Sequence, residues 1–177
     1  MVKILQKDEP LLRGKALKVP VSEIGSEKIN KVLADLKEAM RGEKDAVAIA
    51  APQIGVPFRI FAVSGKLFAS DSPDASLRKE SAAPEMVFIN PEIIRLSRKK
   101  TNVEEGCLSV RWWYGAVERA EKATVKAYDE NGKLFTRGAS GLLAQIFQHE
   151  TDHLDGVLFT DKASGLREDP PEKTLDN

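Results

Sequence analysis

The sequence predicts an α+β domain in which antiparallel β-sheets pack around a central helix carrying an H-E-x-x-H motif, with an additional amphipathic helix near the N-terminus. Three observations lead to this fold class. Apolar residues recur at helical spacing early in the chain, short strand-like segments follow, and the motif lies in a second helical segment near the C-terminus. The length of 177 residues favours one domain with a core of its own.

The first helix is predicted over residues 27–41. Ser26 is a suitable N-cap, and Gly42 can supply a left-handed cap at the other end. Between them, apolar side chains recur three and four residues apart at Ile29, Val32, Leu33, Leu36 and Met40. We therefore expect one face of this helix to pack against the core.

Short strands are predicted in the middle of the chain. Their ranges are 58–64, 86–89, 124–128 and 133–137. A turn containing Asn131-Gly132 separates the last two segments, which predicts an antiparallel hairpin.

The remaining segments complete the expected layout. Residues 65–84 are rich in serine, alanine and charge without a regular period, so we expect an exposed loop. The second helix should begin near Ser140 and end before Gly156. Residues 166–177 contain Pro170-Pro171 and four acids and are predicted to form a loose tail, which leaves residues 1–165 as a single domain.

The bulk composition excludes several classes of partner. The 27 lysines and arginines balance 27 aspartates and glutamates, so no overall field attracts nucleic acid or an anionic membrane. The longest apolar run, residues 46–51, is far below the roughly 20 residues of a membrane-spanning helix, and the N-terminus lacks the apolar core of a signal peptide. We therefore expect a cytoplasmic protein with no membrane partner and no sequence-specific nucleic-acid partner.

The H-E-x-x-H motif is His149-Glu150-Thr151-Asp152-His153. On a helix, histidines four residues apart project from one face and can bind a single metal ion. The same stripe continues upstream through Leu142 and Ile146, which places the imidazoles against the core. The alternative is that both are ordinary core or surface histidines with satisfied hydrogen bonds, beside a solvated glutamate. Because the chain has only two histidines and both fall in this motif, the pattern favours a metal site.

A catalytic site of this type needs a third protein ligand. Phe159 stands where metzincin proteases require a histidine, so that class is excluded. A zinc peptidase could use Glu168 or Glu172 from the tail. Cys107, the single cysteine, follows Gly106 and could complete a site with two histidines and one cysteine, although a lone cysteine is more often a small buried apolar residue. A structural metal module that binds a partner would normally need four protein ligands, and three are visible.

Three segments in the same order resemble the motifs of peptide deformylases: residues 46–53, Glu105–Ser109 and Gln148–Leu154. The resemblance extends over most of the chain, through residues 4–13, 50–55, 90–91 and 114–119. It implies a metal-dependent hydrolase that removes the formyl group from the N-terminal formylmethionine of nascent polypeptides and releases formate. It leaves open a transient contact with the ribosome.

The resemblance also implies the metal ligands and the ion. Cys107, His149 and His153 would hold one divalent ion, which is Fe²⁺ in many deformylases, with Zn²⁺, Ni²⁺ and Co²⁺ as alternatives. The same nitrogen and sulfur donors suit all of these metals, so the sequence does not choose among them.

Catalytic and substrate-binding roles follow from the motif and from the resemblance. Glu150, next to a ligand on the same helix, is suited to act as general base and then as general acid. The resemblance assigns the Gln53 side chain and the Leu108 backbone N–H to the oxyanion. It implies that the substrate contacts Val47, Ala48, Val103, Gly106, Leu142 and Ile146.

The sequence departs from the deformylase pattern at two places. Ala46 and Ala48 replace glycines of the first motif, and the methyl group of Ala48 is expected to crowd the formyl group or the first side chain. The second departure is Arg111-Trp112-Trp113, where deformylases usually have a proline and small residues. The two rings are predicted either to pack on the surface or to form a binding rim.

Overall fold

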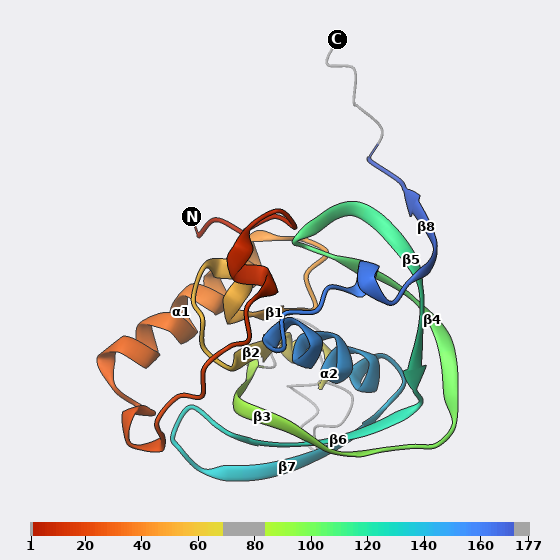
Figure 1. The fold of residues 1–177 in the computed structure, drawn as a ribbon. Coiled ribbons are helices and arrows are strands. Elements are labelled where there is room, and N and C mark those ends of the chain that lie inside the picture. The colour runs from red at the N-terminus through yellow and green to blue at the C-terminus, as the bar shows by residue number, and fades with distance from the viewer. Residues whose placement is uncertain (1, 69–83, 172–177) are drawn as a thin grey trace.

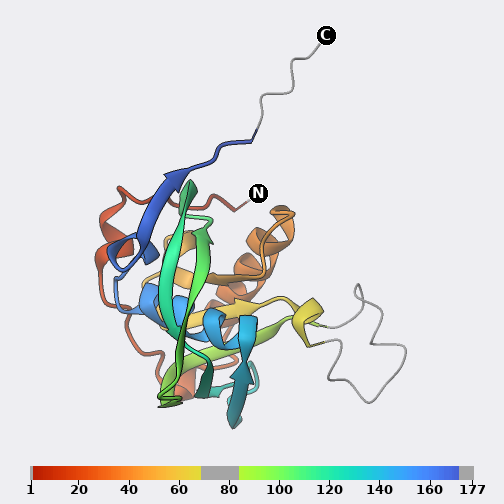
Figure 2. The ribbon, with the colours of Figure 1, turned by 90° about the vertical axis from the view of Figure 1, so that its right-hand side faces the viewer.

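The computed structural model describes residues 2–68 and 84–171, and within them two antiparallel sheets surround the second helix (Figure 1). The larger sheet has the order β1 (Ala48–Ala50), β2 (Ile60–Val63), β3 (Met86–Leu96), β6 (Lys122–Tyr128) and β7 (Leu134–Ser140). The smaller sheet has the order β4 (Lys100–Cys107), β5 (Val110–Ala120) and β8 (Ser164–Glu168), and Figure 2 shows it face-on with β8 along β5.

The two α-helices are α1 (Glu27–Gly42) and α2 (Gly141–Leu154). Short 3-10 helices connect the other elements: Pro10–Arg13, Val21–Glu23, Ala51–Ile54, Gly65–Leu67 and Phe159–Asp161. The predicted α+β class, with a central motif-bearing helix between antiparallel sheets, is confirmed. Among the described residues, no helix is long and apolar enough to cross a membrane.

The predicted N-terminal helix is confirmed, but its end differs. The Ser26 hydroxyl accepts a hydrogen bond from the Ile29 amide at 3.3 Å, as an N-cap should. Gly42 is the last helical residue rather than a left-handed cap, and the chain leaves the helix in an extended conformation at Glu43. The buried residues of α1 are those of the predicted apolar stripe, together with Ala39.

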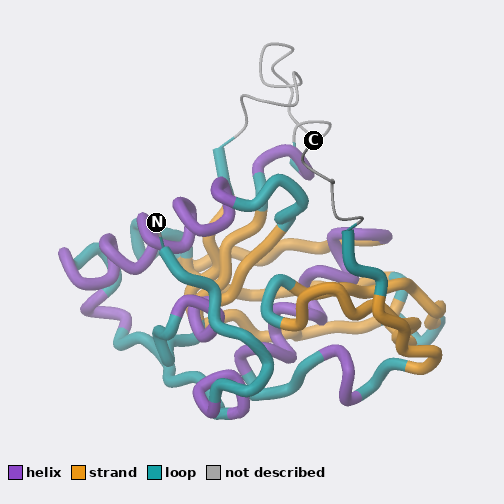
Figure 3. Tube along the Cα trace, turned by 90° about the horizontal axis from the view of Figure 1, so that it is seen from above, coloured by secondary structure: helices purple, strands orange, loops and turns teal. Residues whose placement is uncertain are grey.

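Helices cover both faces of the larger sheet at β2. Phe61 and Val63 point to the side of α2, whereas Ile60 and Ala62 point to the side of α1. On the α2 side, the rings of Phe61 and Phe88 stack with centroids 4.6 Å apart, and Phe147 of α2 packs 5.2 Å from Phe88. In the view from above, α1 lies along the outside of the strands (Figure 3). Since β2 is buried on both faces, it reads as a continuous apolar run.

Several predicted boundaries need correction. Strand β3 continues to Leu96 rather than ending at residue 89, and β4 and β5 form a long hairpin that local patterns did not indicate. The tail is not loose from residue 166, because β8 pairs with β5 and places Arg167 opposite Tyr114. Most of the predicted loop over residues 65–84 lies outside the described residues, and its first residue, Gly65, is buried.

Candidate metal centre

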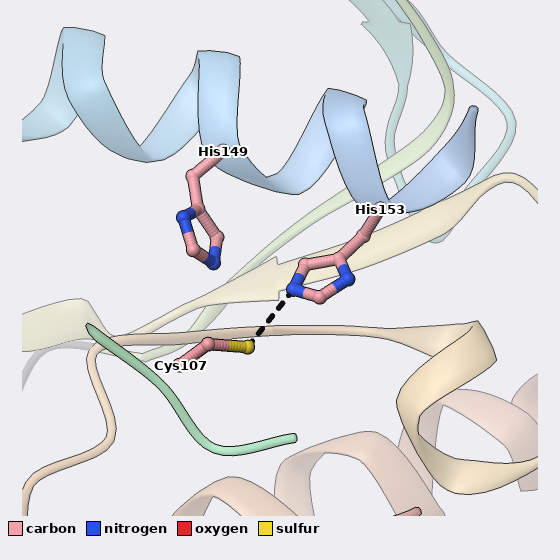
Figure 4. A group of neighbouring side chains, drawn as sticks. All are labelled: Cys107, His149 and His153. Carbon is pink, nitrogen blue, oxygen red and sulfur yellow. Dashed lines mark hydrogen bonds between the residues drawn. The ribbon is translucent and has the colours of Figure 1, made fainter. Parts of the chain in front are cut away.

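The three predicted metal ligands converge from two elements. Cys107 ends β4, and His149 and His153 project toward it from one face of α2 (Figure 4). His153 Nε2 lies 3.2 Å from Cys107 Sγ, and one donor atom from each of the three residues lies within 4.8 Å of the others. Two imidazole nitrogens and one sulfur at this separation are suited to surround a single divalent ion.

The electrostatic environment favours a thiolate at Cys107. Burial alone would raise the pKa of this thiol, but the two histidines, above all His153, lower it to about 5. The Ser109 amide and the Gln53 Nε2 also donate toward the sulfur, at 3.4 and 3.6 Å. Since a cysteine binds metal as the thiolate, these groups prepare Cys107 for that role.

A buried ion-pair network orients His149 from behind. Its Nδ1 lies 2.9 Å from a Glu105 carboxylate oxygen, and Arg119 binds the same carboxylate through two nitrogens at 2.8 and 2.9 Å. Burial opposes ionisation of Glu105, but hydrogen bonds from His149 and Arg119 lower its pKa to about 2. Because an ionised carboxylate can only accept, His149 Nδ1 must carry the proton, which leaves Nε2 available to a metal.

The network extends to the motif itself. Arg119 also contacts Asp152 at 2.6 Å, and Lys162 contacts the same aspartate at 2.7 Å. Asp152 is one of the two variable residues of H-E-x-x-H, so the sequence analysis gave it no role. The resemblance to deformylases could have indicated a role for Asp152, because Glu105, Arg119 and Asp152 all lie in segments that carry it.

Glu150 is buried beside the metal ligands without a full set of partners. Its residue is 4% exposed, and burial raises the pKa of its carboxyl group although the neighbouring histidines oppose this. Within residues 2–68 and 84–171, its Oε2 has no hydrogen-bond partner. Glu150 lines the same cavity as Cys107. A buried carboxylate oxygen that can still accept hydrogen bonds is suited to bind water near a metal.

A cavity of about 370 Å³ opens beside the three donors. Val47 and Leu142, which are 40% and 50% exposed, flank the buried Ile146 on its wall, so apolar surface remains available to a ligand. Ala48 and Gly106 also line it. Val103 of β4 is not among the lining residues, although Glu104 and Glu105, which follow it on the strand, are.

Ala48 lies between the apolar core and the cavity. Ala48 and Ala50 belong to the apolar cluster between the larger sheet and α2, together with Phe61 and Val63. Ala48 is 8% exposed. Its side chain therefore packs against this cluster, and only a small part of its surface is left to the cavity.

The two residues assigned to the oxyanion lie at the same end of the cavity. Gln53 is 2% exposed, and its Oε1 accepts from the Ala50 amide at 2.8 Å while its Nε2 donates to Ser109 Oγ at 3.1 Å. These bonds fix the amide group beside Cys107. Leu108 follows the cysteine directly and lines the cavity.

The N-terminal segment holds both of these residues from outside. The Leu5 amide donates to the Gln53 carbonyl at 2.8 Å, and Gln6 Nε2 donates to the Leu108 carbonyl at 3.1 Å. Sequence analysis assigned these two N-terminal residues no function. Their contribution depends on contacts over long chain separations, which local patterns do not reveal.

The alternative site compositions find no support in this geometry. Glu168 is exposed on β8 opposite Trp113 and is not part of the group of donors, and Glu172 lies outside the described residues. The group found in the described residues has three members, one fewer than a closed structural site requires. An open coordination position is the arrangement of a catalytic site.

Comparison with known proteins decides the family. A sequence model described as polypeptide deformylase matches residues 1–169. A peptide deformylase of Thermomicrobium roseum is 38% identical over 173 residues, which cover 96% of this chain and 92% of that protein. The chain belongs to the polypeptide deformylase family. Removal of the N-formyl group from nascent peptides is accordingly the activity of this domain.

Plant deformylases of this family are longer. Peptide deformylase 1A of Arabidopsis thaliana, described as chloroplastic/mitochondrial, is 43% identical over 166 residues. The match covers 90% of this chain but 60% of the plant protein. The chain thus corresponds to a part of that longer deformylase.

Solved deformylase structures share the fold. The peptide deformylase from Synechococcus elongatus in complex with actinonin has a TM-score of 0.78 at 32% identity, covering 93% of this chain and 81% of that one. The Met-Ala-Ser-bound deformylase from Acinetobacter baumannii has a TM-score of 0.78 at 31% identity, covering 92% and 98% of the two chains. Two sheets around a metal-binding helix are therefore the deformylase fold in this chain as well.

Proposed function

We propose that this chain hydrolyses N-formylmethionyl peptides at Cys107, His149 and His153, with Glu150 as the group that transfers protons. The observation that carries the proposal is the unpaired Oε2 of buried Glu150 in the same cavity as three convergent metal donors. The products are formate and a peptide with a free N-terminal amine.

One divalent ion fits the donor set, and we propose Fe²⁺ as the ion in the cell, with Zn²⁺, Ni²⁺ or Co²⁺ as substitutes. When bound, the ion acts as a Lewis acid that lowers the pKa of water and polarises the formyl carbonyl group. The thiolate of Cys107 and the neutral Nε2 of His149, fixed by Glu105 behind it, are the protonation states that this ion needs.

Glu150 serves first as a base and then as an acid. Its carboxylate accepts a proton from the water that attacks the formyl carbon, and the same carboxyl group then donates a proton to the departing amine nitrogen. The amine leaves neutral, and the carbon–nitrogen bond is the bond that breaks. Burial supports this role, because it makes protonation of the carboxylate easier than in water.

Gln53 and Leu108 stabilise the charge that develops on the formyl oxygen. In this proposal, the Gln53 Nε2 and the Leu108 backbone N–H donate to the oxyanion. The bonds of Gln53 to Ala50 and Ser109 support the role, since they hold the amide group in place. Its second N–H, directed toward Cys107 Sγ at 3.6 Å, is the donor that serves the oxyanion.

The peptide lies in the cavity as an added strand. Within the described residues, β1 pairs with β2 alone and β4 with β5 alone, so the free edges of both strands offer backbone groups near Ala48 and Gly106. The methionine side chain packs against Val47, Leu142 and Ile146, and the exposed apolar surface of Val47 and Leu142 supports this placement.

We further propose that the substrates are nascent formylated chains in the cytoplasm. The Acinetobacter baumannii relative has been solved with Met-Ala-Ser bound, which has the sequence of a processed N-terminus. A transient contact with the ribosome is compatible with such substrates.

Formate release tests the proposal. The protein is purified without oxygen, its metal content is measured, and formyl-Met-Ala-Ser is supplied as substrate. We expect one ion per chain and one formate per peptide consumed. A metal-loaded, folded protein that releases no formate would contradict the proposal.

A further inference from the structure

Three consecutive aromatic residues line the cavity on the side of the smaller sheet: Trp112, Trp113 and Tyr114 at the start of β5. Successive side chains of a regular strand point to opposite faces, so three neighbours should not share one cavity. Trp112 breaks the alternation, because its φ is 54°, in the left-handed region. This backbone conformation turns neighbouring rings toward the same space. We call these three residues the aromatic wall.

The backbone conformation of Trp112 is costly for a bulky residue. Only glycine, and to a lesser degree asparagine and aspartate, adopts positive φ without strain. Such strain persists where surrounding contacts impose it, and it occurs often at ligand-binding positions. Here the Trp112 carbonyl accepts a hydrogen bond from the Asp169 amide at 2.8 Å. The ring is only partly buried, so burial of the indole does not explain why tryptophan stands at this position.

A cation supports each ring of the aromatic wall. The Arg111 guanidinium lies 5.0 Å from the centroid of Trp112 and is itself held by Glu43 and Asp45 at 2.6 and 2.9 Å. Lys7 lies 5.4 Å from the Trp113 ring and Arg167 lies 5.8 Å from the Tyr114 ring. Fixed in this way, the rings lose little freedom when a ligand packs on them.

Tyr114 brings the aromatic wall close to the edge on which a peptide would bind. A Cβ atom added at Gly106 would lie 2.7 Å from the Tyr114 ring, so this ring lies directly against the Gly106 backbone. Gly106 immediately precedes Cys107 on β4. A peptide strand along this edge therefore passes the aromatic wall within one or two residues of its formyl end.

We propose that the aromatic wall is a second specificity site, which binds an aromatic or large apolar side chain at the second or third residue of the formylated peptide. This inference rests on the proposed deformylase function and deepens it. The charges around the wall favour this chemistry: Glu43 and Asp45 bind Arg111, and Glu104 binds Arg167, so none of these acids is left free to bind a basic peptide side chain. The surface of the three rings therefore remains as the attraction for a peptide side chain.

Kinetics with three peptides test the inference. We compare formyl-Met-Ala-Ser with formyl-Met-Phe-Ser and formyl-Met-Ala-Phe at equal metal content. At least one phenylalanine peptide should have a kcat/KM about tenfold higher than formyl-Met-Ala-Ser, the upper range for an aromatic contact. The position that gives the preference identifies the subsite. Equal kcat/KM for all three peptides would overturn the inference and leave the proposed function intact, whereas no formate from any of them would remove the proposed function.

The variant Trp112→Gly tests the residue directly. Glycine tolerates positive φ, so this change removes the ring while retaining the backbone conformation. We expect the ratio of kcat/KM between the preferred phenylalanine peptide and formyl-Met-Ala-Ser to fall from about ten to below about two. Leu134→Ala, which removes an exposed apolar side chain from β7, is the control and should keep the wild-type ratio. A Trp112→Gly ratio equal to wild type would contradict the assignment.

Intrinsic fluorescence provides a readout independent of catalysis. Trp112 and Trp113 are the only tryptophans of the chain, so its emission reports on the aromatic wall alone. Titration with the unformylated product peptides should change this emission, with a Kd severalfold lower for the phenylalanine product than for Met-Ala-Ser. Equal Kd values for these products would overturn the inference even if the enzyme is active.

Discussion

The inner and outer ends of the cavity are both held by an arginine with two acidic partners, but the two arginines differ in environment. At the inner end, Arg119 is 4% exposed and its bidentate partner Glu105 is 3% exposed. At the outer end, the Arg111 side chain is 21% exposed and bridges Glu43 and Asp45, whose side chains are 39% and 60% exposed. Breaking a buried pair leaves an uncompensated charge, whereas exposed pairs contribute little to stability.

This difference separates two kinds of function. The inner network fixes His149, and through it the metal, so changes there should affect metal binding and catalysis together. The outer pairs support a strained aromatic segment, so changes there should affect the choice of substrate. The following predictions test this division, in order of decreasing effect.

Cys107→Ala should have the largest effect. It removes the thiolate from a three-donor site, so tight metal binding and formate release should both be lost. Metal analysis after anaerobic purification measures the first, and formate release the second. Glu168→Gln is the control, because that exposed glutamate is the third ligand only in the zinc-peptidase alternative. A Cys107→Ala protein with a full metal complement would refute the ligand assignment.

Glu150→Gln should retain the metal and the fold but lose proton transfer. We expect turnover to fall at least about a hundredfold, the usual scale for a lost general base. Metal analysis and circular dichroism establish that the variant is loaded and folded before formate release is compared. If turnover stays near wild type, Glu150 has no part in the proton transfer.

Arg119→Gln and Arg111→Gln compare the two ends of the cavity directly. Arg119→Gln should weaken metal affinity about 10- to 100-fold and lower the free energy of unfolding by about 3 to 5 kcal/mol, because Glu105 is left buried without its main partner. Arg111→Gln should cost less than about 1 kcal/mol and leave metal affinity unchanged. Competition with a chelator and urea unfolding measure the two quantities. Similar losses in both variants would contradict the proposed difference between the ends.

Ala48→Gly should have the smallest effect. Its methyl group packs in the core between the larger sheet and α2, so its removal should lower the free energy of unfolding by about 0.5 to 1 kcal/mol through added backbone freedom. We expect kcat/KM for formyl-Met-Ala-Ser to change less than about threefold, which is less than 0.7 kcal/mol. A rise of tenfold or more would mean that the methyl group does crowd the substrate, as the sequence alone suggested.

The sequence by itself determined the elements whose signals are local. The helix over Glu27–Gly42 follows from its N-cap and apolar stripe, and the β6–β7 hairpin from the turn at Asn131-Gly132. The spacing of His149 and His153 is a property of one helix, so their shared face needed no tertiary information. The order of motifs was sufficient for the family, because it matches along most of the chain.

Tertiary structure decided what depends on contacts between distant segments. The pairing of β8 with β5, the Arg119–Glu105–His149 network and the position of Val103 outside the cavity all depend on strand register and on the angle at which α2 crosses the sheets. The positive φ of Trp112 is of the same kind, because tryptophan would not adopt it in isolation. Local propensities describe how each segment prefers to fold, whereas these features arise from how the packed segments constrain one another.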